Sequence, residues 1–418
     1  MTKDLIKYLI GYYQDFVSKI KFEKRQYHLE ANANYVFVGL RRAGKSYLMY
    51  QQIHHLLEQG HSIEEILYFN FEDDRIDIVD VSDLDLIKCC YEEMYEHQPI
   101  FFLDEIQNIK GWEKFARRLA DTGYRVYITG SNAKMLSSEI ATTLGGRYLI
   151  KDIYPFSFKE FLAFKRIDMS DINAIYKYRG DIIKSYEEYF YEGGLPETLQ
   201  MSDKRAWLSS LFNKIFFGDL VARHQIRNDF ALRIMIRKMA ESVKQPTSYS
   251  RIASIVSTVG KKISVDTVID YISYLQESWL MLPYENIAAK LIDKEANRKY
   301  YFIDNGILNL FLVDSATSLL ENQVAIRLRQ LYGENVYFYN QGIEVDFVVY
   351  DEGIAIQVSY SLQDSDTEKR EVDALVKLNK VLPMQKMIII TKDEEKEIVK
   401  SGITIQVVPI WKWLMTEI

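Results

Sequence analysis

The chain has 418 residues, 48% of them hydrophobic and 27% charged, a balance typical of a folded protein of two to four domains. Its formal net charge of −7 argues against a surface covered with nucleic-acid-binding groups, although it leaves room for a local basic patch. The chain contains neither a signal-peptide pattern nor an apolar run of about 18 residues, so we expect a cytoplasmic protein with no membrane partner.

After a predicted helix over residues 4–20, a strand leads into a glycine-rich loop. The apolar run at 35–38 is typical of a buried parallel strand, and the apolar spacing after residue 47 predicts a helix. Between them, residues 39–46 read G-x-x-x-x-G-K-S. The glycines let backbone N–H groups approach a phosphate, and the helix N-terminus adds positive potential. The segment therefore predicts a site for ATP and Mg²⁺.

The residues expected to bind the nucleotide all lie in this loop or at the start of the helix. They are Gly39, Arg41, Arg42, Ala43, Gly44, Lys45, Ser46 and Tyr47. Lys45 would reach the β- and γ-phosphates, and Ser46 would ligate Mg²⁺. Arg41 and Arg42 have two interpretations, since they could contact phosphate or pair with the acidic residues at 72–74.

A second predicted strand, 66–71, ends in that acidic cluster, and a helix follows over about 80–97. The next apolar run, from Pro99, ends in Asp104 and Glu105. We expect Asp104 to hold the Mg²⁺ water shell opposite Ser46 and Glu105 to polarise the attacking water as general base.

The strand predicted at 125–130 is followed by Ser131 and Asn132. Either side chain could orient the attacking water or sense the γ-phosphate, and we take Asn132 as a catalytic candidate; an ordinary turn is the alternative. Strands that alternate with helices predict an α/β domain over residues 1–155, with a parallel sheet covered by helices on both faces.

Arg147 follows two glycines just before another predicted strand. A loop of this kind could carry an arginine toward a transferring phosphoryl group, in its own chain or in a neighbouring subunit. We therefore count Arg147 as a catalytic candidate; an ordinary surface salt bridge is the alternative.

Beyond residue 155 the pattern becomes helical and rich in aromatic residues to about 225, and three short helical patterns follow over 230–290. From residue 298 strands and helices mix again.

Six short motifs together resemble an AAA-like ATPase family of bacteria and archaea that carries an uncharacterised, nuclease-like C-terminal domain. They are the loop at 39–46, Phe102-Leu-Asp-Glu-Ile-Gln107, Thr129-Gly-Ser-Asn132, Leu144-Gly-Gly-Arg147, Tyr154-Pro-Phe-Ser-Phe-Lys-Glu-Phe-Leu162 and Gly193-Gly-Leu-Pro-Glu197. The resemblance implies a P-loop ATPase domain at 1–155, a helical lid at 156–228, a winged-helix-like part at 229–292 and a nuclease-like α/β domain at 293–418.

The winged-helix resemblance rests on two helices predicted around 248–280, the second beginning after Ser264. Its exposed face carries Asp266 and Asp270, whereas a helix that reads DNA presents Arg, Lys, Asn or Gln. We therefore favour a packing module over a DNA reader.

In the last domain the resemblance to a restriction-endonuclease-like core implies Glu321 and Asp346 as metal ligands, followed by an acid-x-Lys pair. This chain has Gln357 and Ser359 at that pair, with Glu344 as one substitute acid. We expect a domain that does not cut DNA. Local hydrogen bonds, or basic residues of the following helix such as Lys369 or Arg370, could hold Glu344 and Asp346.

Three functions remain open from the sequence. The first is an ATPase whose nucleotide state moves the C-terminal module, the second a DNA-binding effector, and the third a nucleotide-binding scaffold with little turnover. An unidentified protein partner, nucleic acid and a second copy of the chain are all compatible with these functions.

Overall fold

The computed structural model describes residues 2–76, 81–131, 142–169, 173–260, 262–290 and 297–416. The chain forms two compact units. Unit 1 comprises Met1–Tyr154 and Glu277–Trp279, and unit 2 comprises Pro155–Gln276 and Leu280–Ile418. Within the described ranges, no helix is both long and apolar enough to span a membrane.

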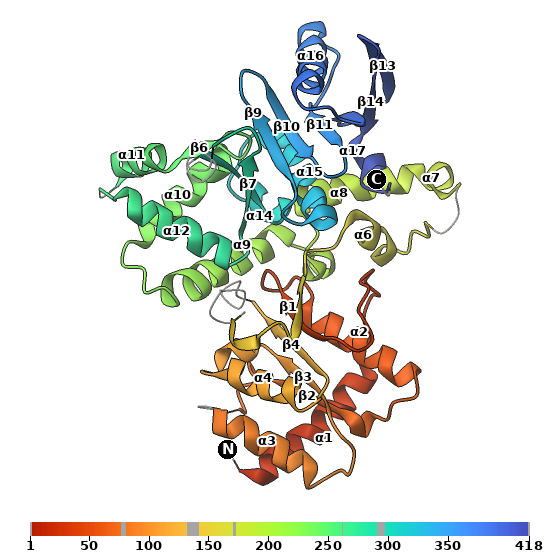
Figure 1. Ribbon diagram of the computed structural model, residues 1–418, viewed down its shortest axis with the longest axis vertical. Helices are drawn as coiled ribbons and strands as arrows, with labels where there is room; N and C mark the ends of the chain where they lie inside the picture. Colours follow the sequence, from red (N-terminus) through yellow and green to blue (C-terminus); the bar gives the residue numbers. More distant parts are fainter. Residues whose placement is uncertain are drawn as a thin grey trace. The chain divides into compact units, whose positions relative to one another are not determined.

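Unit 1 alternates strands with helices (Figure 1). Its helices are α1 (Lys3–Lys19), α2 (Lys45–Glu58), α3 (Val81–Glu92) and α4 (Trp112–Asp121), with short 3-10 turns η1 (Ile63–Glu65) and η2 (Ile106–Asn108). Its strands are β1 (Asn34–Val38), β2 (Ile66–Asn70), β3 (Ile100–Asp104), β4 (Val126–Gly130) and β5 (Tyr148–Asp152).

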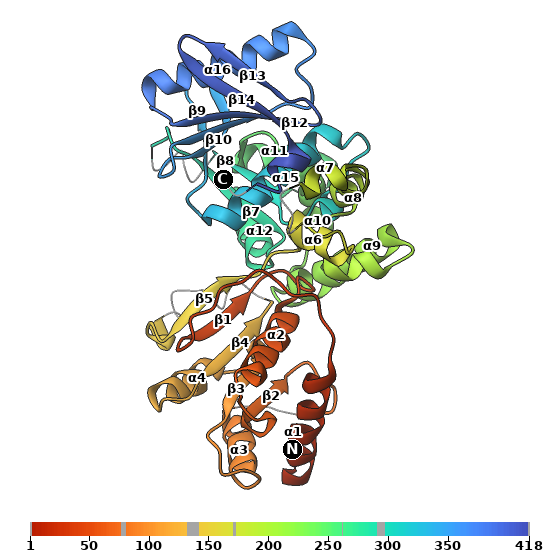
Figure 2. The same ribbon diagram turned by 90° about the vertical axis from the view of Figure 1, so that its right-hand side faces the viewer.

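The five strands form one sheet in the order β2-β3-β4-β1-β5, and every neighbouring pair is parallel. This arrangement confirms the predicted parallel sheet. Helices α2 and α4 flank it from opposite sides (Figures 1 and 2). Because the strands run in one direction, the residues that follow β1, β3 and β4 meet at the same edge.

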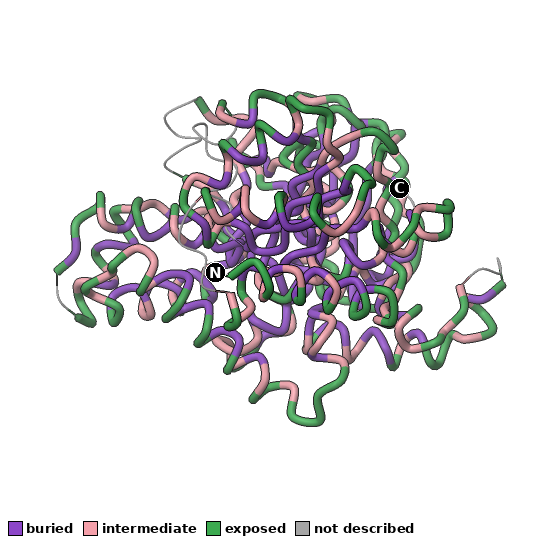
Figure 3. Tube along the Cα trace, turned by 90° about the horizontal axis from the view of Figure 1, so that it is seen from below, coloured by how far each residue is buried: buried purple, intermediate pink, exposed green. Residues whose placement is uncertain are grey.

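The helices of both units bury one face and expose the other, as the alternating colours along them in Figure 3 show. In α1, for example, Ile6, Leu9 and Val17 have no exposed surface. This is the consequence of apolar residues placed every three or four positions.

Unit 2 begins with helices. They are α6 (Phe158–Phe164), α7 (Ala174–Lys177), α8 (Arg179–Glu192), η4 (Pro196–Gln200), α9 (Lys204–Lys214), the π-helical η5 (Ile215–Ala222), α10 (Asp229–Glu241), α11 (Tyr249–Val259) and α12 (Val265–Glu277), whose last residue belongs to unit 1. Its later helices are α14 (Asn305–Asn309), α15 (Ala316–Tyr332), α16 (Ser365–Val381) and α17 (Ile410–Trp413).

A nine-stranded sheet runs through unit 2 in the order β13-β14-β12-β11-β10-β9-β7-β8-β6. Its strands are β6 (Thr247–Ser248), β7 (Met281–Asn286), β8 (Asn297–Phe302), β9 (Tyr337–Asn340), β10 (Glu344–Val349), β11 (Ile354–Val358), β12 (Lys386–Thr391), β13 (Lys396–Lys400) and β14 (Ile403–Pro409). It is mixed, since β10 pairs antiparallel with β11 and β11 pairs parallel with β12.

Two strands differ from the sequence-based expectation. Residues 281–286 form β7 rather than part of a helical pattern, and Pro283 lies inside it opposite Tyr300. Strand β13 went unpredicted because it lies at the edge of the sheet and its sequence, KEIVK, is mostly charged. Because β7 pairs with both β8 and β9, the sheet extends across residue 292, the expected domain border.

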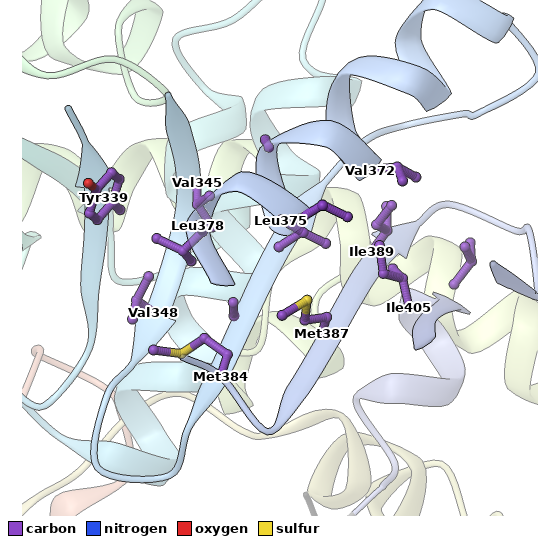
Figure 4. Packing of buried hydrophobic residues seen from close by; sticks show 14 of the residues in the cluster. Tyr339, Val345, Val348, Val372, Leu375, Leu378, Met384, Met387, Ile389 and Ile405 are labelled. Carbon is purple, nitrogen blue, oxygen red and sulfur yellow. The ribbon is translucent and has the colours of Figure 1, made fainter. Parts of the chain in front are cut away.

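Helix α16 packs on the sheet through a cluster of apolar side chains. Figure 4 shows Leu375 and Leu378 of this helix facing Val345 and Val348 of β10, with Met387 and Ile389 of β12 beside them. This packing fixes α16 against β10 and β11, the strands whose polar residues are described below.

Candidate active site

The loop after β1 takes a conformation that depends on glycine. Gly39 has φ 154°, and a Cβ atom there would lie 2.1 Å from the carbonyl oxygen of Ile153. Gly44, with φ 97°, directly precedes α2. A side chain at either position would be strained, so the loop can place its backbone close to a bound group.

Lys45 lies at the first turn of α2 and is only 4% exposed. Its Nζ donates to the carbonyl oxygens of Gly39, at 3.2 Å, and Leu40, at 3.1 Å. The same atom lies 3.6 Å from Oε1 of Glu105. The structure therefore brings the predicted phosphate-binding lysine and the predicted general base together.

Asp104, at the end of β3, is 2% exposed. Its carboxylate accepts hydrogen bonds from Oη of Tyr68, at 2.6 Å, and from Oγ1 of Thr129. Burial raises the pKa of Asp104 and the charge of Glu105 raises it further, whereas the hydroxyl groups of Thr129, Tyr68 and Ser46 oppose the shift.

Glu105 is also buried and has a left-handed backbone, with φ 55°. Its N–H donates to Oγ1 of Thr129 at 2.8 Å, and its Oε2 accepts from Nε2 of Gln107 at 2.5 Å. Burial acts to raise the pKa of Glu105, but Lys45, Gln107 and Arg41 outweigh it and hold the pKa below its usual value. Glu105 therefore stays ionised, as a general base must.

Thr129 connects the two acids, since its hydroxyl donates to Asp104 and accepts from the N–H of Glu105. Sequence analysis had considered Ser131 and Asn132 instead. Ser131 is buried, and its Oγ lies 3.4 Å from Nε2 of Gln107, whereas Asn132 lies outside the described residues. A hydroxyl at the end of the strand beside β3 was the signal that could have found Thr129.

Arg25 is a second residue that sequence analysis missed. It is 6% exposed, and its guanidinium donates to the carbonyl oxygens of Ala43 and Tyr154, both at 2.9 Å. It therefore braces the glycine-rich loop against the last residue of the first segment of unit 1. Arg25 belongs to no motif, so the sequence contained no signal for it.

The other loop residues expected to bind the nucleotide, Arg41, Arg42 and Tyr47, lie in different surroundings. Nη1 of Arg41 donates to Oε1 of Glu72 at 2.9 Å, so Arg41 pairs with the acidic cluster. Arg42 has φ 63° and an exposed side chain, and Tyr47 is 47% exposed with its ring edge-on to Tyr50.

Arg147 is not brought to this edge in its own chain. It precedes β5, and Tyr148 pairs with Asn34 at the beginning of β1, so Arg147 lies at the amino end of the parallel sheet. Its Nε pairs with Asp121, and its Nη1 donates to the carbonyl oxygen of Gly145 at 3.1 Å. The surface salt bridge is therefore present, and Arg147 lies at the edge of the sheet opposite the glycine-rich loop.

The donor chemistry around Ser46 and Asp104 fits Mg²⁺. Both offer oxygen atoms, the ligands that this ion prefers, and the Ser46 hydroxyl acts on the Asp104 carboxylate by lowering its pKa. Two such neighbouring side chains can hold the ion or its water shell at the edge of the sheet where the glycine-rich loop lies.

Unit 2 contains an acidic cleft of about 680 Å³, lined in part by Glu321 of α15 and by Glu344 and Asp346 of β10. All three carboxylates lie within 3.4 Å of Nζ of Lys299, which is on β8. Burial raises the pKa of Glu321 to about 7, although Lys299 opposes that shift.

Of the two expected ways of holding Glu344 and Asp346, local hydrogen bonds are present at Asp346, whose Oδ2 accepts from the N–H of Val358 at 2.9 Å, whereas Arg370 does not pair with either acid. Arg370 pairs with Glu371 at 2.7 Å, and it is Lys299 that lies among Glu321, Glu344 and Asp346. The lysine comes from a strand distant in sequence, so only the fold could reveal it.

Gln357 and Ser359 have separate roles. Gln357 accepts from the N–H of Asp346 at 2.8 Å and donates to Glu371 at 2.8 Å, so it orders the floor of the cleft. Ser359 donates to the carbonyl oxygen of Ser361 at 3.0 Å.

Comparison with known proteins gives two family matches. Residues 31–162 match the model of an AAA domain, and residues 183–318 match a domain of unknown function (DUF8612). The chain is 32% identical to Uncharacterized protein MJ1544 of Methanocaldococcus jannaschii, over 91% of this chain and 88% of that protein. It is also 32% identical to an uncharacterized protein of Haemophilus influenzae, over 80% and 84% of the two chains.

Among solved structures, the walker-type ATPase PABY2304 of Pyrococcus abyssi is 13% identical, with a TM-score of 0.35. The match covers 66% of this chain and 90% of that one. A similarity of this size is too low to support a functional argument.

Proposed function

We propose that this chain, which belongs to the AAA-domain P-loop ATPase family, binds ATP with Mg²⁺ and hydrolyses its terminal phosphoanhydride bond in unit 1. One observation carries the proposal. An ionised, buried Glu105 lies 3.6 Å from Lys45 of the glycine-rich loop. Glu105 directly follows Asp104, at the same edge of the sheet as this loop.

The roles of the side chains follow from their positions. When the nucleotide binds, Lys45 gives up its hydrogen bonds to the Gly39 and Leu40 carbonyl oxygens and donates to phosphate oxygens instead. The backbone N–H groups of the loop donate to other phosphate oxygens. Ser46 and Asp104 would hold Mg²⁺, which would supply positive charge against the phosphates of the nucleotide.

Glu105 takes the proton of the attacking water at its carboxylate. Thr129 holds the Glu105 backbone and Gln107 holds its Oε2, so both groups orient the base toward the γ-phosphate position. Arg147, if it acts on a phosphate, does so on that of a second copy of the chain.

The loop also has a direct covalent route to unit 2. Gly39 lies against the carbonyl oxygen of Ile153, and Arg25 ties Ala43 to Tyr154, the residue before unit 2 begins at Pro155. We infer that a change in the loop on hydrolysis is passed along this segment and moves unit 2.

For unit 2 the proposal is narrower. Helices α11 and α12 would act as a winged-helix-like packing module, and the nuclease-like part at 293–418 would bind a partner without cutting DNA. The acidic exposed positions Asp266 and Asp270 of α12 support the first point. The glutamine and serine at positions 357 and 359 support the second.

The test compares ATP binding and Mg²⁺-dependent phosphate release in four proteins. Glu105→Gln should keep ATP and lose turnover by about 10²–10⁴-fold, because the neutral amide cannot take the proton of the water. Lys45→Ala should weaken ATP binding by roughly 10–100-fold, the loss of a charge-assisted contact.

Glu113→Gln, on α4, is the matched control, since it makes the same change of charge in unit 1 outside the loop. It should behave like wild type. Undiminished hydrolysis by the Glu105→Gln protein would show that the base lies elsewhere.

A further inference from the structure

A buried lysine pairs with three of the acids that line the cleft of unit 2. Lys299 has no exposed surface, yet its ammonium is surrounded by carboxylates from two different elements. The Nζ atom lies 3.1 Å from Oε1 of Glu344 and 3.4 Å from both Oε1 of Glu321 and Oδ1 of Asp346. The three acids therefore converge on one point, and the lysine occupies it.

The carboxylates around Lys299 are further satisfied by the protein itself. Oδ2 of Asp346 accepts from the N–H of Val358 at 2.9 Å, and Oε1 of Glu321 accepts from Oη of Tyr301 at 2.7 Å. Tyr301 lies two residues after Lys299 on β8, so both side chains project from the same face of that strand. One strand thus supplies the charge and a hydroxyl donor to the acidic cluster.

The lysine remains charged in this position. Burial alone would lower its pKa, but Glu321, Asp346 and Glu344 together raise the pKa above its ordinary value. A buried ammonium is stable only when it is paired and hydrogen-bonded, and this one is.

We propose that the ammonium of Lys299 is the resident cation of this acidic cluster and that it excludes divalent metal ions from the Glu321, Glu344 and Asp346 carboxylates. A divalent ion binds carboxylate oxygens at about 2.0–2.6 Å. An ion held by the oxygens that contact Lys299 would lie almost against the ammonium, where both charge and space oppose it.

The proposal changes what the cleft can do. The position between its three acids is occupied by a side chain that neither dissociates nor exchanges ligands, so these acids cannot present a metal ion to a phosphodiester. The cleft is instead a permanent polar surface, whose lining also includes Lys244 and the α16 residues Arg370 and Lys377. It binds its partner without a metal.

The test uses the full chain without nucleotide and Mn²⁺ as the probe. Lys299→Met should unfold at a lower temperature than wild type, and millimolar Mn²⁺ should raise its melting temperature. Electron paramagnetic resonance should detect about one more bound Mn²⁺ per chain than in wild type, because the vacated carboxylates now hold the ion. Adding Asp346→Asn to this variant should remove the gain.

Lys392→Met is the matched control. Lys392 is also buried in unit 2, but its ammonium pairs with the single carboxylate of Glu187. Its loss should lower stability without creating a response to Mn²⁺. The same response in both variants, or none in Lys299→Met, would overturn the proposal.

A second comparison remains decisive if Lys299→Met does not fold. Wild type and the Asp346→Asn single variant should bind equal amounts of Mn²⁺, since Lys299 keeps the ion away from Asp346 in both. Mn²⁺ binding in wild type that disappears in Asp346→Asn would refute the resident-cation role.

Discussion

Each unit places a buried lysine against acidic side chains, but the two lysines are held differently. Lys45 contacts two backbone carbonyl oxygens and lies 3.6 Å from a single carboxylate. Lys299 lies within 3.4 Å of three carboxylates. The first lysine has neutral partners that a phosphate can replace, whereas the partners of the second already neutralise its charge.

This difference shows that the same pair of residue types can form a binding site or a closed ionic cluster. Phosphate binding needs a lysine whose contacts are weaker than those it will form with the ligand. A lysine among three carboxylates stabilises its surroundings and has little to gain from a new anion. The variants below test each side of this contrast.

The largest expected effect is on the rate of ATP hydrolysis, and it tests whether Arg147 of a second copy of the chain acts at the unit 1 site. If Arg147 reaches the phosphate of a second copy, Arg147→Ala should slow hydrolysis roughly 10³-fold while sparing ATP binding. Specific activity of wild type should rise with protein concentration. Mixing the Arg147→Ala and Lys45→Ala proteins should restore part of the activity, because each supplies what the other lacks.

Arg117→Ala provides the control for this experiment. Arg117 lies on α4 and also pairs with Asp121, at 3.6 Å, so it shares the surface partner of Arg147. It should hydrolyse ATP at the wild-type rate. Equal, small effects of both variants would reduce Arg147 to a surface salt bridge and leave the unit 1 site without an arginine from a neighbour.

Asp304 sharpens the contrast because backbone N–H groups, rather than a lysine, surround this buried carboxylate. It is 1% exposed and accepts from the N–H of Gly194 at 2.7 Å and of Ile307 at 3.2 Å. Burial raises its pKa from 3.8 to about 6, although these bonds oppose the shift. Because the folded-state pKa is the higher one, the stabilisation is fully present below pH 3.8 and is lost as the pH rises through 6.

Chemical denaturation of wild type and Asp304→Asn between pH 4.5 and 7.5 measures this effect. The free energy of unfolding of wild type should fall relative to the variant by about 2 kcal/mol as the pH rises over this range, since the lower end lies roughly 1.5 pH units below the folded-state pKa of about 6. Asp314→Asn, at an exposed position, should retain the wild-type profile. Parallel pH profiles for wild type and Asp304→Asn would contradict the assignment.

The smallest expected effect is at Thr129, which orders the acids of unit 1. Thr129→Val keeps the shape of the side chain but removes the hydroxyl that binds Asp104 and the Glu105 N–H. We expect kcat to fall about tenfold with KM nearly unchanged, together with a loss of about 1.5 kcal/mol of stability. Thr129→Ser should recover most of kcat. A proportional change in KM, or no rescue by serine, would mean that Thr129 serves packing alone.

The sequence predicted most of unit 1 correctly because its signals are local. The loop at 39–46 needs glycines, a lysine and a serine at fixed spacing, and it stands between an apolar strand and an amphipathic helix. The acids Asp104 and Glu105 follow a five-residue buried strand, which periodicity also identifies. For these residues, neighbours in sequence are neighbours in space.

The sequence predicted less of unit 2, because the contacts that matter there join segments distant in sequence. The residues of β7 were included in a predicted helical region, because a six-residue segment that contains Pro283 shows no clear alternation of apolar and polar residues. Lys299 stands in the apolar stretch Lys299-Tyr-Tyr-Phe-Ile and resembles a flanking charge, yet it lies among acids from residues 321, 344 and 346.

Sequence alone therefore determined the order of strands and helices in unit 1, the glycine-rich loop and the two acids that follow β3. Tertiary structure decided which side chains meet. It placed Thr129 between Asp104 and Glu105, Arg25 beneath the loop, Arg147 at the far edge of the sheet and Lys299 at the convergence of three carboxylates. The reason is physical: spacing along the chain fixes the period of an element, but pairing between strands and burial of charge depend on which elements the fold brings together.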